Sequence, residues 1–291
     1  MPVTAASALD ATTWQSLAEA HADRADAFTA GRRERRSRQQ KHAIEDFLFE
    51  YYPVTPAALR RWHPGVGVAL EAPAPHAGWR WDRETDGVVA LDVDAFVADR
   101  GDAVRFIHGL LTATLGRPAL TGCFGLHEWA MVYRLAEDET RHADWPLRLG
   151  PDGTDAVVES HRIACSHFDA YRFFTGPARP LNTLSPTSAD RPAFEQPACL
   201  HAGMDLYKHA FRLTPMICSD LVAECFELAR DIRVLDMRAA PYDLAGLGFA
   251  PIKIETAAGK AEYADAQRAF ADRGAPLRAR LVAECERLLA V

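Results

Sequence analysis

The densest group of residues that could do chemistry lies in residues 160–174, SHRIACSHFDAYRFF. If this segment is a strand, side chains alternate along it, and His167, Asp169 and Tyr171 share one face. His167 or Asp169 could then carry a proton, while Phe173 and Phe174 could stack on a planar ring. The segment therefore predicts a binding or catalytic pocket. The alternative is ordinary core packing with a polar edge.

Two further segments combine polar and apolar side chains in the same way, GLHEWAMVYR at 125–134 and CLHAGMDLYKHAF at 199–211. Glu128 lies among apolar residues, which are the surroundings of a general acid or base. The stretch HEWAM is not the HExxH pattern of zinc proteases, because Met131 stands where the second histidine would be. The alternative is a carboxylate at the positive end of a helix.

A helix over 200–211 would bring His201 and Asp205 onto one face, one turn apart. His209 lies a further turn on, about 12 Å from His201, so one ion could not bind all three residues. His201 and Asp205 remain candidates for a pair of metal ligands or for an acid/base couple. The alternative is an ordinary hydrogen-bonded polar pair.

A basic stretch, RRERRSRQQK at 32–41, stands out from a chain whose formal charge is −7. Such a patch can contact phosphate groups of a nucleic acid or a small substrate. The candidate phosphate-binding residues are Arg32, Arg33, Arg35, Arg36 and Lys41. The alternative is a solvated helix face, and the negative net charge weakens the case for duplex binding.

Cysteine spacing and hydropathy indicate the compartment. No apolar run approaches the roughly 20 residues that span a bilayer, and the N-terminus lacks the layout of a signal peptide. The six cysteines show no CxxC spacing. We expect a soluble cytoplasmic protein without a membrane partner, and with reduced, largely buried cysteines.

The elements that position these residues are mainly helical. Apolar spacing predicts helices over 14–28, 43–52, 93–115, 126–134 and 199–212. Further helices are expected to begin at Pro56 and Ser219, and the C-terminus is expected to be helical, with the helix restarting at Pro276. Thr12 or Thr13 is the expected N-cap of the first helix. Asp86-Gly87 marks the turn of a β-hairpin within 79–92, and residues 251–256 predict a lone strand. The charges at 227–238 predict surface ion pairs, by Glu227, Arg230, Asp231, Arg233, Asp236 and Arg238.

The predicted fold class is therefore mainly α, an irregular multi-helix globular fold with a small β-hairpin or minor sheet. We predict one domain over 1–291, with an N-terminal helix and basic segment over 1–42. Residues 175–198 predict a long loop, because they are rich in proline, serine and threonine.

Several segments together resemble an actinobacterial family commonly labelled 3-methyladenine DNA glycosylase. The resemblance covers most of residues 30–290 and is carried by the segments KHAIEDFLFEYY, RRWHPGVGVAL, GLHEWAMVYR, GTDAVVESHRIACSHFDAYRFF, CLHAGMDLYK and CFELARDIRVLDMRAAPYDL. It implies hydrolysis that releases an alkylated purine base from DNA, with the damaged base flipped out and stacked between aromatic rings. Residues 63–67, HPGVG, are similar to the hairpin of helix-hairpin-helix glycosylases, but the sequence that follows is too short and proline-broken for the second helix.

In that hypothesis the protein needs a carboxylate to stabilise the sugar cation, a stacking pocket and basic contacts. Asp169, Asp205 or Glu128 would be the carboxylate, and the basic stretch would bind phosphate. The substrate-binding set would be Trp129, Tyr171, Phe173, His201 and Arg172. Damaged DNA or another nucleobase-containing substrate would be the partner, and no cofactor is required.

Two alternatives stay open. The first is a small-molecule enzyme that uses the same pocket, with a divalent metal bound by His161, His167 or His201. The second is a non-catalytic helical binding protein, in which substitution of His167 or Asp205 would change stability alone.

Overall fold

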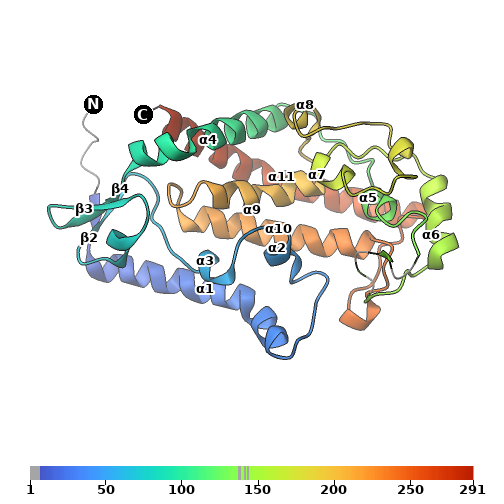
Figure 1. Cartoon of the computed structure of the whole chain (residues 1–291), viewed down its shortest axis with the longest axis horizontal. Coiled ribbons are helices and arrows are strands. Elements are labelled where there is room, and N and C mark those ends of the chain that lie inside the picture. The colour runs from blue at the N-terminus through green and yellow to red at the C-terminus, as the bar shows by residue number, and fades with distance from the viewer. Residues whose placement is uncertain (1–6, 137–138, 141, 143, 291) are drawn as a thin grey trace. The chain divides into compact units, whose positions relative to one another are not determined.

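The structure is a computed structural model that describes residues 7–136, 139–140, 142 and 144–290. It is mainly α with one small mixed sheet, which confirms the predicted fold class (Figure 1). The chain divides into two compact units. Unit 1 comprises the described parts of Met1–Gly109, Leu206–Glu227 and Ala279–Val291, and unit 2 comprises Leu110–Asp205 and Leu228–Arg278. The prediction of a single domain is not tested by this division and stays a prediction.

The sheet belongs to unit 1 and has the strand order β1-β2-β4-β3. It is built from β1 (Ser7–Leu9), β2 (Val68–Glu71), β3 (Asp82–Thr85) and β4 (Val88–Leu91). β1 runs parallel to β2, whereas the other pairs are antiparallel. The predicted hairpin is confirmed as β3 and β4, and Asp86 and Gly87 both have positive φ, 51° and 78°, as a type I′ turn requires.

The long helix of unit 1 is α1 (Ala11–Ser37), which packs near β2. Its N-cap is Asp10, whose carboxylate accepts a hydrogen bond from the Thr13 N–H, so the predicted threonine caps are wrong. Trp14 joins a buried cluster with Trp62 and with Leu70 of β2. Short helices follow at α2 (Phe47–Glu50), α3 (Pro56–Leu59) and the 3₁₀ turn η1 (Pro75–Gly78). The predicted helix over 43–52 is thus reduced to a single turn.

Four helices contribute residues to both units: α4 (Val93–Leu115), α9 (Leu200–Arg212), α10 (Ser219–Ala239) and α11 (Ala257–Leu289). The predictions for α4, α9 and the start of α10 are confirmed. α11 is also confirmed as the C-terminal helix, but Pro276 lies inside it and does not start a new one.

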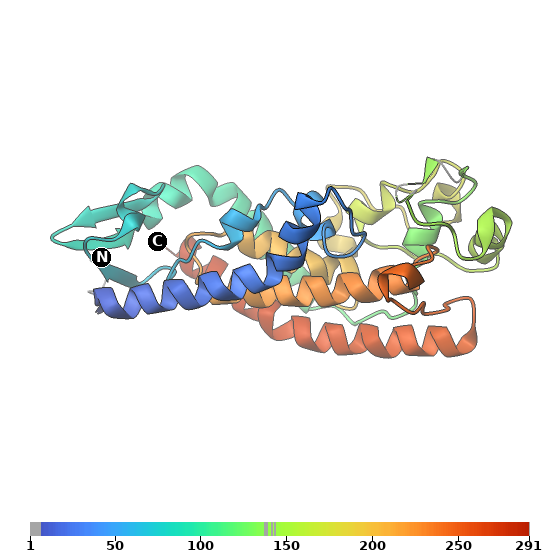
Figure 2. The same cartoon turned by 90° about the horizontal axis from the view of Figure 1, so that it is seen from below.

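The other elements of the described residues belong to unit 2 and are short. They are α5 (Leu126–Ala130), α6 (Gly150–Glu159), α7 (Phe168–Tyr171), η3 (Arg179–Leu181), α8 (Arg191–Phe194) and η4 (Ala245–Leu247). Within unit 2, α10 and α11 lie side by side (Figure 2), and Arg273 of α11 binds Asp231 of α10 at 2.8 Å. The predicted loop at 175–198 is interrupted by η3 and α8.

Two strand predictions are wrong. Residues 251–256 contain turns and no strand, with the Thr256 N–H bonded to the Lys253 carbonyl. Residues 168–171 form the single turn α7, so the alternation expected of His167, Asp169 and Tyr171 does not exist. No helix among the described residues is long and apolar enough to cross a membrane.

Candidate functional site

The site lies in unit 2 and is built around α5. This helix begins after Gly125, which has φ 71°. A Cβ at Gly125 would lie 3.3 Å from the ring of Tyr263 and 3.4 Å from Ala239. Glycine therefore suits this position for two reasons, the positive φ and the close packing. Trp129 anchors the same turn, because its indole N–H donates to the Ala239 carbonyl at 2.8 Å. These contacts fix α5 against the end of α10.

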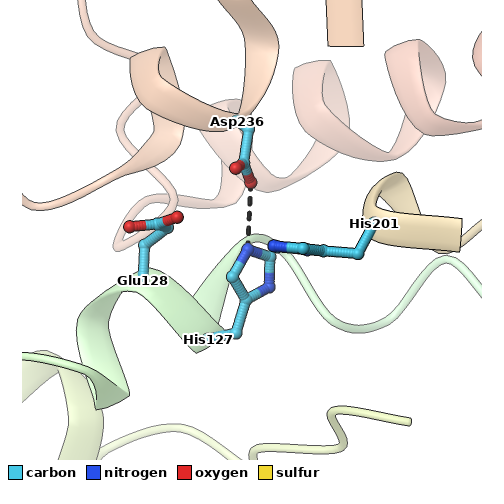
Figure 3. A group of neighbouring side chains, drawn as sticks. All are labelled: His127, Glu128, His201 and Asp236. Atoms are coloured by element: carbon cyan, nitrogen blue, oxygen red, sulfur yellow. Dashed lines mark hydrogen bonds and ion pairs between the residues drawn. The ribbon is translucent and has the colours of Figure 1, made fainter. Parts of the chain in front are cut away.

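His127 and Glu128 of α5 both face charged residues of α10. His127 Nε2 lies 3.0 Å from Asp236 Oδ1 (Figure 3). Arg233, one turn before Asp236, donates from Nη1 to Glu128 Oε1 at 3.2 Å and to Asp236 Oδ2 at 3.0 Å. Asp236 is fully buried and Arg233 is 1% exposed. Burial makes these charges interact strongly, since little water screens them.

His201, in the first turn of α9, completes the group. Its ring centroid lies 4.5 Å from that of His127, and Figure 3 shows its ring directed at the space beside the Asp236 carboxylate. Ligand atoms of His127, Glu128, His201 and Asp236 all lie within 4.8 Å of one another. We call these four residues the His/carboxylate cluster.

The two histidines of this cluster differ in their affinity for a proton. Burial lowers the pKa of His127, but the neighbouring Asp236 outweighs it, so the net shift is upward. Burial also opposes ionisation of Asp236, yet His127, His201 and Arg233 hold the pKa of Asp236 below its usual range. Burial and the adjacent His127 lower the pKa of His201 well below its usual value. These shifts favour a protonated His127 paired with an ionised Asp236, beside a neutral His201 with a nitrogen lone pair.

A second buried group lies next to the first. His167 is 1% exposed, and its ring centroid is 5.3 Å from that of His201. His167 Nε2 lies 3.5 Å from both Glu195 Oε1 and Asp205 Oδ2. Arg191 holds these carboxylates, donating to Glu195 at 2.6 Å and to Asp205 at 2.9 Å. Asp205, the partner predicted for His201, is thus bonded to Arg191.

A cavity of about 600 Å³ opens against both groups. His127, His167 and His201 line it with neighbouring rings. We call these three residues the histidine floor and the cavity the histidine pocket. Residues 160–167 supply much of its wall as irregular chain. Cys123, Cys165 and Cys199 also line it, and all six cysteines are free, three of them buried and three half-buried. The volume suits a small organic ligand.

Most of the other predicted site residues lie outside the pocket lining. Trp129, a residue of α5, is fully buried and is not a lining residue. Arg172 lies 3.3 Å from Asp169 and stacks on Phe173, which is 37% exposed. The ring of Tyr171 packs on Phe174. Of the expected substrate-binding set, the pocket lining includes His201, together with the predicted catalytic residue His167.

The predicted phosphate-binding residues belong to unit 1, where several of them form ion pairs with acidic side chains. Arg33 binds Asp26 at 2.6 Å, and Arg35 binds Glu45 and Asp46. Arg32 lies 3.8 Å from Asp46. Arg32, Arg36 and Lys41 line a smaller cavity of about 320 Å³. The basic stretch is therefore a partly neutralised helix end.

The sequence-based interpretation missed Asp236 and Arg233, which it placed in surface ion pairs. Asp236 lies on a buried face of α10, because Ala229, Ile232, Asp236 and Ala239 recur at helical spacing and all are buried. A charge in the middle of an apolar stripe was the available signal. Glu195 was also missed, since it lies in the segment that predicted a loop.

Comparisons with protein-family models, with curated proteins and with solved structures find no match to this chain.

Proposed function

We propose that this chain is a divalent-metal-dependent enzyme acting on a small molecule in the histidine pocket. The observation that carries the proposal is the convergence of two imidazoles and two carboxylates from three separate helices, all buried, with both imidazoles lining a cavity. Imidazole and carboxylate together suit Zn²⁺, Fe²⁺ and Mn²⁺.

The metal would be bound by His127, His201 and Asp236, with Glu128 as the fourth candidate ligand. In a tetrahedral site, metal–ligand distances of about 2.0–2.2 Å place ligand atoms roughly 3.4 Å apart. The observed separations of up to 4.8 Å would therefore contract by roughly 1 Å on binding. On binding, the ion would replace the proton that lies between His127 and Asp236, because metal ligands must be deprotonated.

The other groups have consistent roles in this proposal. Because Arg233 donates to one oxygen of Glu128 and one of Asp236, it would orient the metal-binding carboxylates, as outer-shell partners do. A bound ion would polarise a water molecule or a substrate oxygen. His167, between Glu195 and Asp205, is positioned to donate or accept a proton in the same cavity.

The test is metal binding by the chelator-treated full chain, measured by calorimetry with Zn²⁺, Mn²⁺ and Co²⁺. We expect one ion per chain and a loss of affinity of at least tenfold in His201→Gln and in Asp236→Asn. His161→Gln is the matched control, because His161 lines the same pocket but binds the Val157 carbonyl through Nδ1. Thermal melts establish that each variant is folded. The proposal fails if no ion binds, or if the control loses as much affinity as His201→Gln.

The resemblance to DNA glycosylases gives a second candidate function. The observation that favours it is the pocket, which has room for a purine and carries Arg162 and Lys260 in its wall. Its test is release of 3-methyladenine from alkylated duplex DNA, measured by chromatography. Loss of release in Asp205→Asn but not in Asp169→Asn would point to the buried carboxylate. No release by folded protein would reject this candidate.

A further inference from the structure

The wall of the histidine pocket has an uneven distribution of charge. Its described lining includes two cationic side chains, Arg162 and Lys260, and no aspartate or glutamate. Four carboxylates nearby are not lining residues and are bonded to Arg233 or Arg191; they are those of Glu128, Asp236, Glu195 and Asp205. A ligand in this cavity therefore meets positive charge directly and negative charge only through an imidazole.

The two cations differ in their surroundings. Arg162 is exposed, in the irregular segment that follows α6. Lys260, in the first turn of α11, is partly buried, and its Nζ lies 6.0 Å from the centroid of the Phe124 ring. A lysine stem that lies along apolar surface keeps its ammonium at the boundary with water. Both charges are thus accessible to a ligand.

Most of the remaining wall is apolar. Leu120, Phe124, Leu126, Leu184 and Leu200 contribute to it, together with the three pocket cysteines, whose thiols behave as small hydrophobes. Burial raises the pKa of Cys165 to about 12, so this thiol stays neutral. The body of a ligand would therefore be stabilised by removal of apolar surface from water.

One cationic lining residue lies close in the chain to one of the lining histidines. Arg162 and His167 are both lining residues and are five positions apart, so their Cα atoms lie at most about 18 Å from each other. The cationic wall and the histidine floor are thus within the length of one small molecule.

We infer that the substrate of this site is an anionic amphiphile. Its carboxylate or phosphate group would bind Arg162 and Lys260, its apolar body would contact the leucines and Phe124, and its reactive part would lie near the histidine floor. The word substrate rests on the proposed metal-dependent function, whereas the binding preference rests on the pocket alone.

Calorimetry with one tail and four head groups tests this inference: octanoate, octyl phosphate, octanol and octylamine, each below its micelle concentration. We expect one of the two anions to bind at least tenfold more tightly than octanol and octylamine, and the tighter anion identifies the head group. Lys260→Met and Arg162→Met should each weaken anion binding several-fold, and together about tenfold or more, while binding of octanol is unchanged.

Lys253→Met is the matched control, because Lys253 is exposed, lies in the same unit and is not a lining residue. Equal affinity for octanol and for both anions would overturn the inference, as would an effect of Lys253→Met equal to that of Lys260→Met. Metal content is measured on the same samples. Anion binding without metal binding sustains this inference and rejects the proposed function, and the reverse result rejects this inference alone.

Discussion

Replacing Arg233 by glutamine is expected to destabilise the protein strongly. Arg233 is 1% exposed and donates to two carboxylates, those of Glu128 and Asp236. Glutamine keeps hydrogen-bonding capacity but removes the charge, so two buried carboxylates would face one protonated His127. Removing one partner of a buried ion pair costs about 3–5 kcal/mol, because the remaining charge is left uncompensated. His127 still neutralises Asp236, so we expect a loss within that range and not twice it.

The assay is urea unfolding followed by circular dichroism, with the free energy of unfolding extrapolated to water. Arg268→Gln is the control, since Arg268 is exposed on α11 and pairs with Asp265 one turn away. An exposed pair of this kind contributes at most about 0.5 kcal/mol. The contrast between the two variants isolates the effect of burial.

A divalent ion gives this prediction a second readout. An ion bound to the cluster would supply the charge lost in Arg233→Gln, so the ion should raise the melting temperature of the variant more than that of the wild type. If Arg233→Gln is as stable as Arg268→Gln, the buried charges do not interact as described. If the ion stabilises variant and wild type equally, the carboxylates are not its ligands.

Three further predictions concern stability. Gly259→Ala should cost more than about 2 kcal/mol in urea unfolding, because its Cβ would lie 2.0 Å from the Lys253 carbonyl oxygen, whereas Gly246→Ala, with open space around it, should cost far less. Burial raises the pKa of Asp82 to about 7, so the wild-type protein loses stability as pH rises from about 4 to 7. Asp82→Asn should therefore be about 1–2 kcal/mol more stable than the wild type between pH 5 and 8. A stability difference that does not change with pH would refute this prediction. Burial lowers the pKa of His63 to about 3, so stability is lost as pH falls below about 6.5, and His63→Gln should melt with less sensitivity to acid between pH 7 and 4.

The elements that sequence predicts best are those determined locally. The hairpin follows from the Asp86-Gly87 turn, and α4 follows from the helical spacing of its apolar residues. The segment around His167 is different, because its backbone is set by contacts from elsewhere in the chain. Asn182, for example, accepts a hydrogen bond from the Cys165 N–H and donates one to the Cys165 carbonyl. Such a clamp gives irregular chain where alternation alone favours a strand.

The same distinction applies to the site. The histidines at 127, 167 and 201 could be selected by residue type, since each stands among apolar neighbours. Their pairing with Asp236 could not be read in the same way, because Asp236 is 109 residues from His127 and its i, i+3 pairing with Arg233 resembles that of any surface helix. The one signal was its place in an apolar stripe. Conversely, aromatic residues such as Phe173 have the composition of a stacking site but point to the surface, which only the packing of α7 decides.

The wide spacing of the cluster along the chain links ligand binding to folding. His127, His201 and Asp236 come from three helices, so an ion held by all of them closes a loop of 109 residues and can stay bound only while those helices are in place. Local opening of unit 2 would therefore release the ion, and the bound ion would oppose that opening. Amide exchange should report this coupling as added protection in α5 and in the unit 2 parts of α9 and α10, and should leave the sheet of unit 1 unchanged.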